Sequence, residues 1–417
     1  MGHESRLTEI WKVPGKAHQE IIHRTGKYGS KGEALRGQTR GKQTQEDNME
    51  FRIAVLPGDG VGPEVTTEAL KALEAIEAKS DHNFIFRNGM IGAVAYEKLG
   101  EALPRETVDI CRTSDAVLFG AVGEPRYEVP GLEKRPESGY GLIRLRKEMG
   151  LFANVRPVKL FSFLIDASRL KPEVVSGVDF IIIRELTGGI YFGEPKELIR
   201  SPEGRSAVDS MRYSENEIKR IVRVGFELAR SRRKKLTSVD KFQILRCSDL
   251  WREVVNEVAT EYADVSLEHV HVDACAMGLI LNPRSFDVIV TENLFGDILS
   301  DEASMLVGSL GMMPSASLAG IPKEGKRVFG LYEPIHGSAP DIAGRNVANP
   351  LAAILSAALM LRFSLGLETE ARRIEEIVTQ VLAEGYRTAD IVSDGTTKLG
   401  TKEMGNLIAE RITGNSL

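Results

Sequence analysis

An α/β fold is the class that this sequence predicts, and three observations support it. Phe51-Arg-Ile-Ala-Val-Leu56 is a short apolar run typical of a buried strand. A glycine-rich turn follows at 57–63, and an amphipathic helical pattern then extends over about 64–78. Further strand and helix patterns alternate along the chain, which is typical of helices packed on a mostly parallel sheet.

The later elements follow the same two patterns. Short apolar runs bounded by polar or turn residues predict buried strands at 116–119, 179–183, 235–239 and 286–290. Helical periodicity predicts helices at 215–231, 249–262, 351–361 and 369–384. The sequence shows neither an internal repeat nor a low-complexity tract.

The bulk properties favour small-molecule chemistry. A chain of 417 residues is long enough for two domains with cores of their own. Its formal net charge of -5 gives no basic surface for nucleic acid or an anionic membrane. No apolar run approaches the roughly 20 residues that cross a bilayer. Three cysteines are too few and too widely spaced for a disulfide framework, which indicates a reducing cytoplasm.

Residues 1–48 differ from the rest of the chain. They mix basic and acidic residues without an apolar period, and we expect a disordered tail there. The segment lacks the apolar stretch of a secretory signal, and its acidic residues argue against a transit peptide. Met49 directly precedes the first strand, so 1–48 could also be a misassigned extension, with the fold beginning at Met49.

The glycine turn Gly58-Asp-Gly-Val-Gly62 lies where dinucleotide-binding folds carry a phosphate loop. The standard glycine spacing would need a third glycine at position 63, where Pro63 stands. A Rossmann fold is therefore not expected. The turn instead indicates a tight strand-to-helix connection with Pro63 near the first helical position.

An acidic set could bind a divalent metal. Asp297 and Asp301 stand four residues apart, so a helix there would place both carboxylates on one face. With Asp273 they form a set of hard oxygen ligands suited to Mg²⁺ or Mn²⁺. Such a pair is usually only a solvated face, but its neighbours Ile298 and Leu299 are apolar. The metal box of isoprenoid synthases has similar spacing, but it requires an all-helical chain, and the predicted strands exclude that.

Four arginines are candidates for holding a substrate with carboxylates. A guanidinium can bind a carboxylate through two parallel hydrogen bonds. Arg184 is the strongest candidate because it follows a very apolar strand, and ligands bind at strand ends in open α/β sheets. The others are Arg144, Arg146 and Arg156, each of which is by default a surface charge or an ion-pair partner.

Two further segments could serve catalysis and cofactor binding. Tyr191 could act as a general acid, and Lys241, which follows a predicted strand, could act as an amine base. His336 opens a turn-rich loop that ends at Asp341. A carboxylate that accepts hydrogen bonds from ribose hydroxyls repels a 2′-phosphate, so Asp341 favours NAD over NADP.

Taken together, four segments resemble the β-decarboxylating dehydrogenases, the family of isocitrate, homoisocitrate, tartrate and 3-isopropylmalate dehydrogenases. They are LPGDGVGPEV from Leu56, RELTGGIYFGEP from Arg184, NLFGDILSDEAS from Asn293 and EPIHGSAPDIAG from Glu333. The resemblance extends from about Phe51 to the C-terminus. The segment RELTGGIYFG is similar to the 3-isopropylmalate branch, since the isocitrate-type and homoisocitrate-type members usually carry an Asn-Thr-Glu variant there.

The resemblance implies an activity. It is the NAD-dependent oxidative decarboxylation of (2R,3S)-3-isopropylmalate to 4-methyl-2-oxopentanoate and CO2, a step of leucine biosynthesis, with Mg²⁺ or Mn²⁺. Homoisocitrate, tartrate or D-malate are alternative substrates within the family. A non-catalytic regulatory member is a further alternative, against which the presence of Lys241, Tyr191 and the three aspartates argues.

The resemblance also implies residue roles. Lys241 assists removal of the hydroxyl proton, and Tyr191 delivers a proton to the carbon left after CO2 departs. The implied substrate-binding residues are Arg146, Arg156, Arg184 and Asp273, with Leu142 and Ile143 against the isopropyl group. The implied metal ligands are Asp273, Asp297 and Asp301. The implied cofactor-binding residues are Glu333, His336, Gly337, Ser338, Ala339, Pro340, Asp341, Ile342 and Asn349.

The fold that the resemblance implies is an isopropylmalate dehydrogenase-like pair of doubly wound α/β domains. Segments 49–151 and 308–417 would form a discontinuous cofactor-binding domain. Segment 152–307 would form the central substrate, metal and dimerisation domain. The family resemblance implies a homodimer with shared sites, in which Lys241 and Asp273 reach the cleft of the neighbour.

The chain departs from the family pattern at two places. Lys241-Phe-Gln-Ile-Leu245 stands where members typically have Lys-Ala-Asn-Val-Leu, so Phe242 adds bulk and Gln243 replaces an asparagine near the nicotinamide. The insertion-like Ser138-Gly-Tyr-Gly141 before the substrate helix also differs. Both departures put the recognised acyl side chain in question more than the reaction class.

Overall fold

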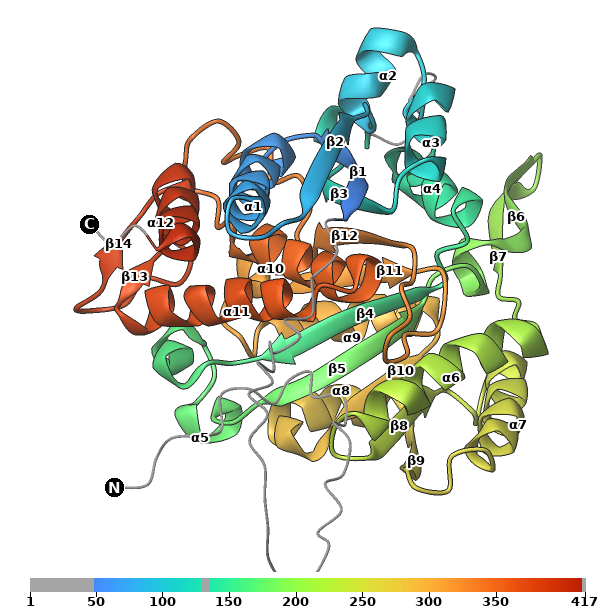
Figure 1. The fold of residues 1–417 in the computed structure, drawn as a ribbon. Helices are drawn as coiled ribbons and strands as arrows, with labels where there is room; N and C mark the ends of the chain where they lie inside the picture. The colour runs from blue at the N-terminus through green and yellow to red at the C-terminus, as the bar shows by residue number, and fades with distance from the viewer. Residues whose placement is uncertain (1–48, 129–135, 415–417) are drawn as a thin grey trace, which may run out of the picture.

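A ten-stranded sheet forms the centre of the protein in the computed structural model, which describes residues 49–128 and 136–414 (Figure 1). The tail expected at 1–48 lies outside the described residues. Across the sheet the strand order is β2-β1-β3-β12-β11-β4-β5-β10-β8-β9. The strands are β1 (Glu50–Gly58), β2 (Asn83–Asn88), β3 (Ala116–Ala121), β4 (Ala153–Lys159), β5 (Asp179–Glu185), β8 (Lys235–Asp240), β9 (Ser266–His271), β10 (Val288–Thr291), β11 (Pro314–Leu318) and β12 (Gly330–Pro334).

Two antiparallel strands join two parallel halves of this sheet. β2, β1, β3 and β12 are parallel neighbours, and so are β5, β10, β8 and β9. Between them, β11 pairs antiparallel with both β12 and β4, and β4 pairs antiparallel with β5. The sheet therefore runs without a break from one half of the molecule to the other.

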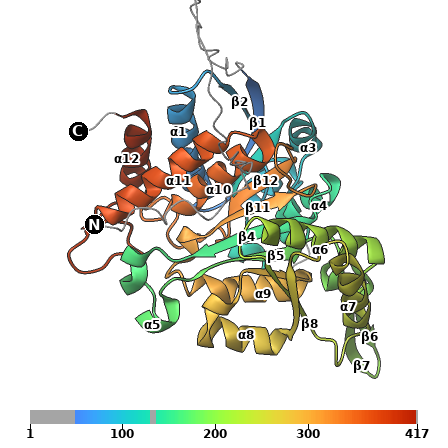
Figure 2. The same ribbon diagram turned by 60° about the horizontal axis from the view of Figure 1, so that its bottom comes forward.

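Helices cover both faces of each half (Figures 1 and 2). In the β1 half, one face carries α1 (Gly62–Glu77), α10 (Leu351–Met360), α11 (Glu368–Ala383) and α12 (Thr401–Thr413). The other face carries α2 (Ala93–Leu99), α3 (Arg105–Arg112) and α4 (Leu142–Glu148). In the β5 half, α6 (Glu215–Arg230) and α7 (Arg246–Ala259) lie opposite α8 (Val272–Leu281) and α9 (Asn293–Ser304). This is the doubly wound arrangement that the sequence predicts.

Smaller elements lie at the periphery. The hairpin of β6 (Gly193–Ser201) and β7 (Gly204–Ser210) is a separate, mostly exposed ribbon. The remaining short elements are α5 (Pro172–Val175), β13 (Tyr386–Arg387) and β14 (Thr397–Lys398). No helix in the described ranges is long and apolar enough to span a bilayer.

The predicted elements are confirmed, with small shifts at their ends. The strand expected at 286–290 is β10, which begins at Val288, and the helix expected at 249–262 is α7, which begins at Arg246. Asp297 and Asp301 both lie in α9, so that stretch is helical as expected. One large apolar core runs through both halves of the sheet, and a second, smaller core lies in the β1 half beneath α3 and α4.

The glycine turn between β1 and α1 requires glycine at two positions. Gly58 and Gly60 have φ angles of 71° and 58°, which L side chains rarely adopt. A Cβ atom on Gly60 would lie 2.0 Å from the carbonyl oxygen of Ser338, so the loop after β12 packs directly on this turn. The turn is a tight strand-to-helix connection with Pro63 in the first turn of α1, as predicted.

Candidate active site

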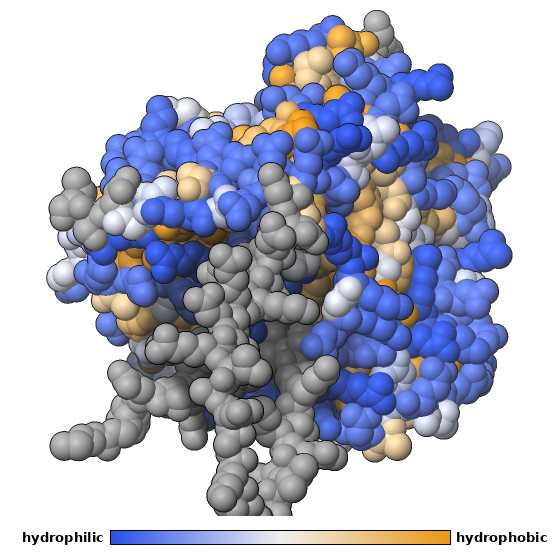
Figure 3. Space-filling view, in the orientation of Figure 1, coloured by the Kyte–Doolittle hydropathy of each residue, from blue (hydrophilic) through white to orange (hydrophobic). Residues whose placement is uncertain are grey.

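A cavity of about 260 Å³ lies between the two halves of the sheet, on the face that carries α4 and α9. Elements far apart in the sequence line it, including α4, β4, β5, α9 and the loop after β12. Figure 3 shows hydrophobic residues gathered in a band between the part that carries α2–α4 and the part that carries α6 and α7. The predicted site residues that line the cavity are Leu142, Ile143, Arg146, Arg156, Arg184, Tyr191, Asp297, Glu333, His336 and Gly337.

Arg184 is fixed at the end of β5 by α9. Its Nε and Nη2 donate to the Oδ1 of Asn293 at 3.0 and 2.8 Å, and its Nη1 donates to Asp297. A Cβ atom on Gly296 would lie 2.6 Å from the Arg184 side chain, so glycine lets α9 pack against it. The guanidinium is held in one orientation, facing the cavity.

Arg156, on β4, is buried beside it. Its Nε donates to the Oδ1 of Asn154 at 2.5 Å, and its Nη1 donates to the Oγ of Ser300. Burial, together with the like charge of Arg184, lowers the pKa of Arg156 to about 10. Arg156 therefore stays charged at neutral pH, and two buried guanidinium groups side by side suit an anionic ligand.

Arg146, in the last turn of α4, faces the same cavity from the other half. Its Nη2 lies 2.5 Å from the Oε1 of Glu333, and this residue pair is almost fully buried. Arg144, two residues earlier, is exposed, donates to the carbonyl oxygen of Leu103 and lies near Glu148. Of the four candidate arginines, Arg144 is the one that does not line the cavity.

Tyr191 shares a carboxylate with the arginines. Its hydroxyl donates to the Oδ2 of Asp297 at 2.8 Å, and the guanidinium of Arg184 lies 5.5 Å from the centre of its ring. Burial raises the pKa of Tyr191, and the hydrogen bond to Asp297 raises it further. Burial alone would also raise the pKa of Asp297, but Arg184 and Arg156 lower it more, so this carboxylate is ionised.

The α9 carboxylates provide part of a metal site. The Oδ1 atoms of Asp297 and Asp301 lie 3.7 and 3.8 Å from the Nη1 of Arg156, so both reach the same small volume. Two hard oxygen ligands on one helix face fit Mg²⁺ or Mn²⁺ but do not complete its coordination. Within residues 49–128 and 136–414, no group of three His, Cys, Asp or Glu side chains could hold a metal.

Lys241 and Asp273 lie together, away from this cavity. The Nζ of Lys241 donates to the Oδ1 of Asp273, and this hydrogen bond lowers the pKa of Asp273. Neither residue lines the cavity that holds Arg184 and Tyr191. The structure thus brings the two expected residues to one another but not to the other site residues of the same chain.

The expected cofactor loop lies against the glycine turn. The amide of Val61 donates to the carbonyl oxygen of Ser338 at 2.8 Å. His336 and Gly337 reach the cavity, whereas Asp341 is exposed and Arg345 donates to its backbone oxygen at 3.4 Å. Asn349 is buried and donates to Asp390 at 3.0 Å. The loop is thus joined to the cavity at His336 and open to solvent at Asp341.

Sequence reasoning missed the residues that orient the arginines. Asn293, Asn154 and Ser300 each bond a guanidinium. Asn293 and Ser300 carried a signal, since both lie in the NLFGDILSDEAS segment, whereas Asn154 carried none. The insertion-like 138–141 segment places Tyr140 in the cavity wall, where its hydroxyl donates to the carbonyl oxygen of Glu124 at 2.9 Å.

Comparison with known proteins identifies the family of this chain. The model of the isocitrate/isopropylmalate dehydrogenase family matches residues 52–408. The 3-isopropylmalate dehydrogenase of Dehalococcoides mccartyi strain 195 is 60% identical over 367 residues, which cover 88% of this chain and all of that protein. The 3-isopropylmalate dehydrogenase of Aquifex aeolicus is 53% identical, with 87% of this chain and 97% of that protein covered.

Solved structures resemble the whole fold. The isocitrate dehydrogenase of Methylococcus capsulatus superposes with a TM-score of 0.76 at 35% identity, covering 87% of this chain and 99% of that one. A β-decarboxylating dehydrogenase of Thermococcus kodakarensis superposes with a TM-score of 0.69 at 33% identity, covering 87% of this chain and 96% of that one.

Proposed function

The chain belongs to the isocitrate/isopropylmalate dehydrogenase family, and from that premise we propose that it oxidises and decarboxylates (2R,3S)-3-isopropylmalate with NAD. The products are 4-methyl-2-oxopentanoate and CO2, as in leucine biosynthesis. One observation carries the proposal: three arginines, a tyrosine hydroxyl and an α9 carboxylate converge on one cavity with an apolar wall. Such a cavity matches a branched 2-hydroxy diacid.

The three arginines bind different parts of a dianionic substrate. Arg156 and Arg184 present two buried positive charges from neighbouring strands, and Arg146 faces them from α4. The two carboxylates of the substrate would therefore bind to different arginines, and this fixes the orientation of the carbon chain between them. Leu142 and Ile143 form an apolar wall at the start of α4, where an isopropyl group loses contact with water.

The protein side chains move protons at two atoms. Lys241 would assist removal of the hydroxyl proton at C2, the bound NAD would accept the hydride, and the β-carboxylate would then leave as CO2. Tyr191 delivers a proton to C3. When bound by Asp297, Asp301 and Asp273, Mg²⁺ or Mn²⁺ would supply a Lewis acid that stabilises negative charge during decarboxylation. The loop that contains His336 and Asp341 would hold the NAD.

A homodimer with shared sites explains why Lys241 and Asp273 lie away from the cavity of their own chain. Apolar side chains are exposed on and beside α8 and α9, among them Leu281 at 76% and Ile298 at 57%. Exposed apolar clusters of this kind mark protein–protein contacts. A two-fold contact through this face would bring Lys241 and Asp273 of each chain towards the α9 carboxylates of the other.

The sheet supports the expected division into domains. Strands β4, β5, β8, β9 and β10 all belong to segment 152–307 and form one end of the sheet. Strands β1, β2, β3, β11 and β12 belong to 49–151 and 308–417 and form the other end. We infer that these are the central domain and the discontinuous cofactor-binding domain, with the site between them. The three cysteines are free, which fits the proposed cytoplasmic location.

A panel of acids tests the substrate. We expect fastest NADH formation with 3-isopropylmalate, and at least about tenfold lower kcat/KM with D-malate, because each buried methylene contributes roughly 0.8 kcal/mol. Homoisocitrate and tartrate complete the panel, and omission of the divalent cation should stop turnover. Negligible turnover of 3-isopropylmalate beside fast turnover of another acid would overturn the substrate, and no NADH with any acid would overturn the enzymatic proposal.

Cofactor preference depends on Asp341. We expect the wild-type protein to prefer NAD over NADP by at least about tenfold in kcat/KM, because the carboxylate repels a 2′-phosphate. Asp341→Asn should lower the ratio of kcat/KM with NAD to kcat/KM with NADP. The variant would bind NAD more weakly and would no longer repel the 2′-phosphate of NADP. Asp81→Asn, which also removes an exposed carboxylate, is the control and should leave the ratio unchanged. Equal use of both cofactors by the wild-type protein would contradict the assignment.

A further inference from the structure

A second cavity lies on the opposite face of the sheet from the active-site cavity. It has a volume of about 330 Å³, which lies at the lower end of the range for small-molecule sites. β4 separates the two cavities, since Arg156 faces the active-site cavity whereas its neighbours Pro157 and Lys159 line the second one. On β11, Ser315 likewise lines the active-site cavity, whereas Pro314 lines the second one. We call the second cavity the rear cavity.

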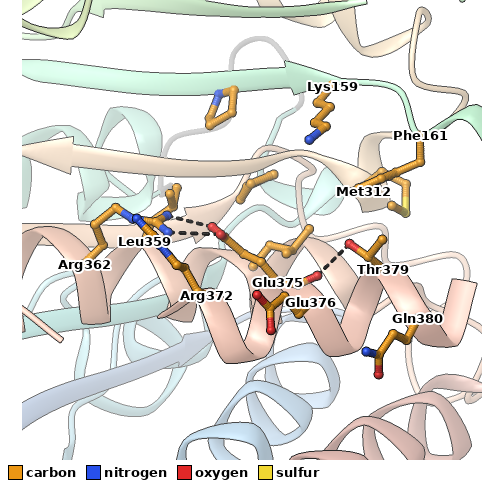
Figure 4. Close-up of a pocket in the computed structure, with 13 residues that line it drawn as sticks. Lys159, Phe161, Met312, Leu359, Arg362, Arg372, Glu375, Glu376, Thr379 and Gln380 are labelled. Atoms are coloured by element: carbon orange, nitrogen blue, oxygen red, sulfur yellow. Dashed lines mark hydrogen bonds and ion pairs between the residues drawn. The ribbon is translucent and has the colours of Figure 1, made fainter. Parts of the chain in front are cut away.

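The rear cavity has apolar walls and one end that carries charge. Its apolar side chains come from β11, α10 and the segment after β4, and include Phe161, Met312 and Leu359. Figure 4 shows Lys159 reaching from the strand on one side, with Glu375, Glu376, Thr379 and Gln380 on the helix opposite. An occupant would therefore contact both the 152–307 segment and α11.

Most charges at this cavity are already paired. The Nε of Arg362 donates to Glu368 and its Nη1 to Glu375, both at 2.7 Å. The Nε of Arg372 likewise donates to Glu368 at 2.7 Å. These arginines have their carboxylate partners within the fold, so they do not require a ligand.

Two charged groups are the exceptions among the described residues: Glu376 is exposed to solvent, and Lys159 is partly buried. The Nζ of Lys159 lies 5.5 Å from the ring centre of Phe161, and among the described residues it has neither an ion pair nor a hydrogen bond. The nearby carboxylates of Asp179 and Glu375 are bound by Arg232 and Arg362. Burial lowers the pKa of Lys159, and the charges of Asp179 and Glu375 only partly oppose this shift. A partly buried ammonium without a hydrogen bond or an ion pair is unfavourable, and an anionic ligand would stabilise it.

From this geometry we propose that the rear cavity binds a small carboxylate with an aliphatic body, with its carboxylate on Lys159 and its aliphatic part on the apolar walls. A charge-assisted hydrogen bond to the ammonium would offset the desolvation of Lys159. Burial of the aliphatic part would add about 0.8 kcal/mol for each methylene. This site takes no part in the reaction proposed above.

Calorimetric titration of the full chain with 4-methylpentanoate tests the proposal. We expect saturable binding with a Kd of about 1 mM or below. The neutral analogue 4-methylpentan-1-ol should bind at least about tenfold more weakly, because it lacks the charge that pairs with Lys159. Absence of saturable binding, or equal binding of acid and alcohol, would overturn the proposal.

Two variants locate the binding. Lys159→Met keeps the length of the side chain but removes its charge, and should weaken binding by about tenfold or more. Lys171→Met is the matched control on an exposed lysine and should bind as the wild-type protein does. Thr379→Phe places a ring in the cavity from the half-exposed face of α11 and should abolish binding even if Lys159→Met fails to fold.

The competing outcome is binding of the probe to the arginines of the active-site cavity. In that case Arg184→Lys would weaken binding, whereas Lys159→Met and Thr379→Phe would leave it unchanged. That pattern would overturn the rear-cavity proposal without affecting the proposed enzymatic function.

Discussion

Lys241→Ala is expected to lower kcat by about 10²-fold or more, because it removes the amine that we propose assists removal of the hydroxyl proton. The fold should persist, since Lys241 lies at the protein surface after β8 and contacts the exposed Asp273. Steady-state NADH formation at saturating 3-isopropylmalate measures the effect, and thermal unfolding checks the fold. Partial recovery with added methylamine is expected, because a free amine can replace the missing one.

Lys171→Ala is the control for this variant, since it removes an exposed lysine outside both cavities and should keep the wild-type rate. Wild-type turnover in Lys241→Ala would mean that the base is a different group. A large loss in both variants would point to a general effect of surface charge.

Arg184→Lys is expected to lower kcat/KM by about 10²-fold, although the positive charge is kept. Lysine cannot reproduce the planar fork that bonds Asn293 and Asp297 while facing the ligand. A carboxylate of the substrate would lose its two parallel hydrogen bonds, which are the strong, oriented kind. We expect the loss to fall mainly on KM, because binding of the dianion changes more than the proton transfers.

Arg105→Lys is the matched control, since the side chain of Arg105 is 94% exposed on α3. It should leave both kcat and KM unchanged. If Arg184→Lys kept the wild-type KM, Arg184 would not bind a carboxylate of the substrate, and the proposed orientation of the diacid would be wrong.

The sequence predicted the strands that carry continuous apolar runs, and it missed β4, whose apolar run is interrupted. β5 contains the apolar run Phe180-Ile-Ile-Ile183, and β10 is apolar except for Thr291, so the hydrophobic pattern alone locates them. β4 was not predicted, because Asn154, Arg156 and Pro157 interrupt its apolar pattern. The same strand holds Arg156, which we propose binds the substrate, and the demands of such a site override those of the core.

Long-range contacts are the second limit. Arg146 and Glu333 form a buried pair across 187 positions of sequence, and spacing along the chain gives no sign of it. The sheet order, with β12 and β11 inserted between β3 and β4, brings them together. Family motifs located Arg146, Arg184 and Tyr191 at the cavity, but the partners that orient the guanidiniums required coordinates.

The position of Lys241 has no functional explanation within one chain, whereas a dimer explains it. Lys241 and Asp273 lie outside the cavity of their own chain, while Tyr191 and Asp297 lie inside it. We therefore propose that a complete site takes groups from two copies of the chain. In the proposed dimer, each site combines Lys241 of one chain with Tyr191 of the other.

Hybrid dimers test this claim most directly. Chains carrying Lys241→Ala and Tyr191→Phe, with different affinity tags, are co-expressed, and the hybrid is purified through both tags. Each hybrid then contains one site with both native residues and one with neither, so we expect about half the wild-type rate from two nearly inactive parents. A hybrid no more active than its parents would contradict the shared site.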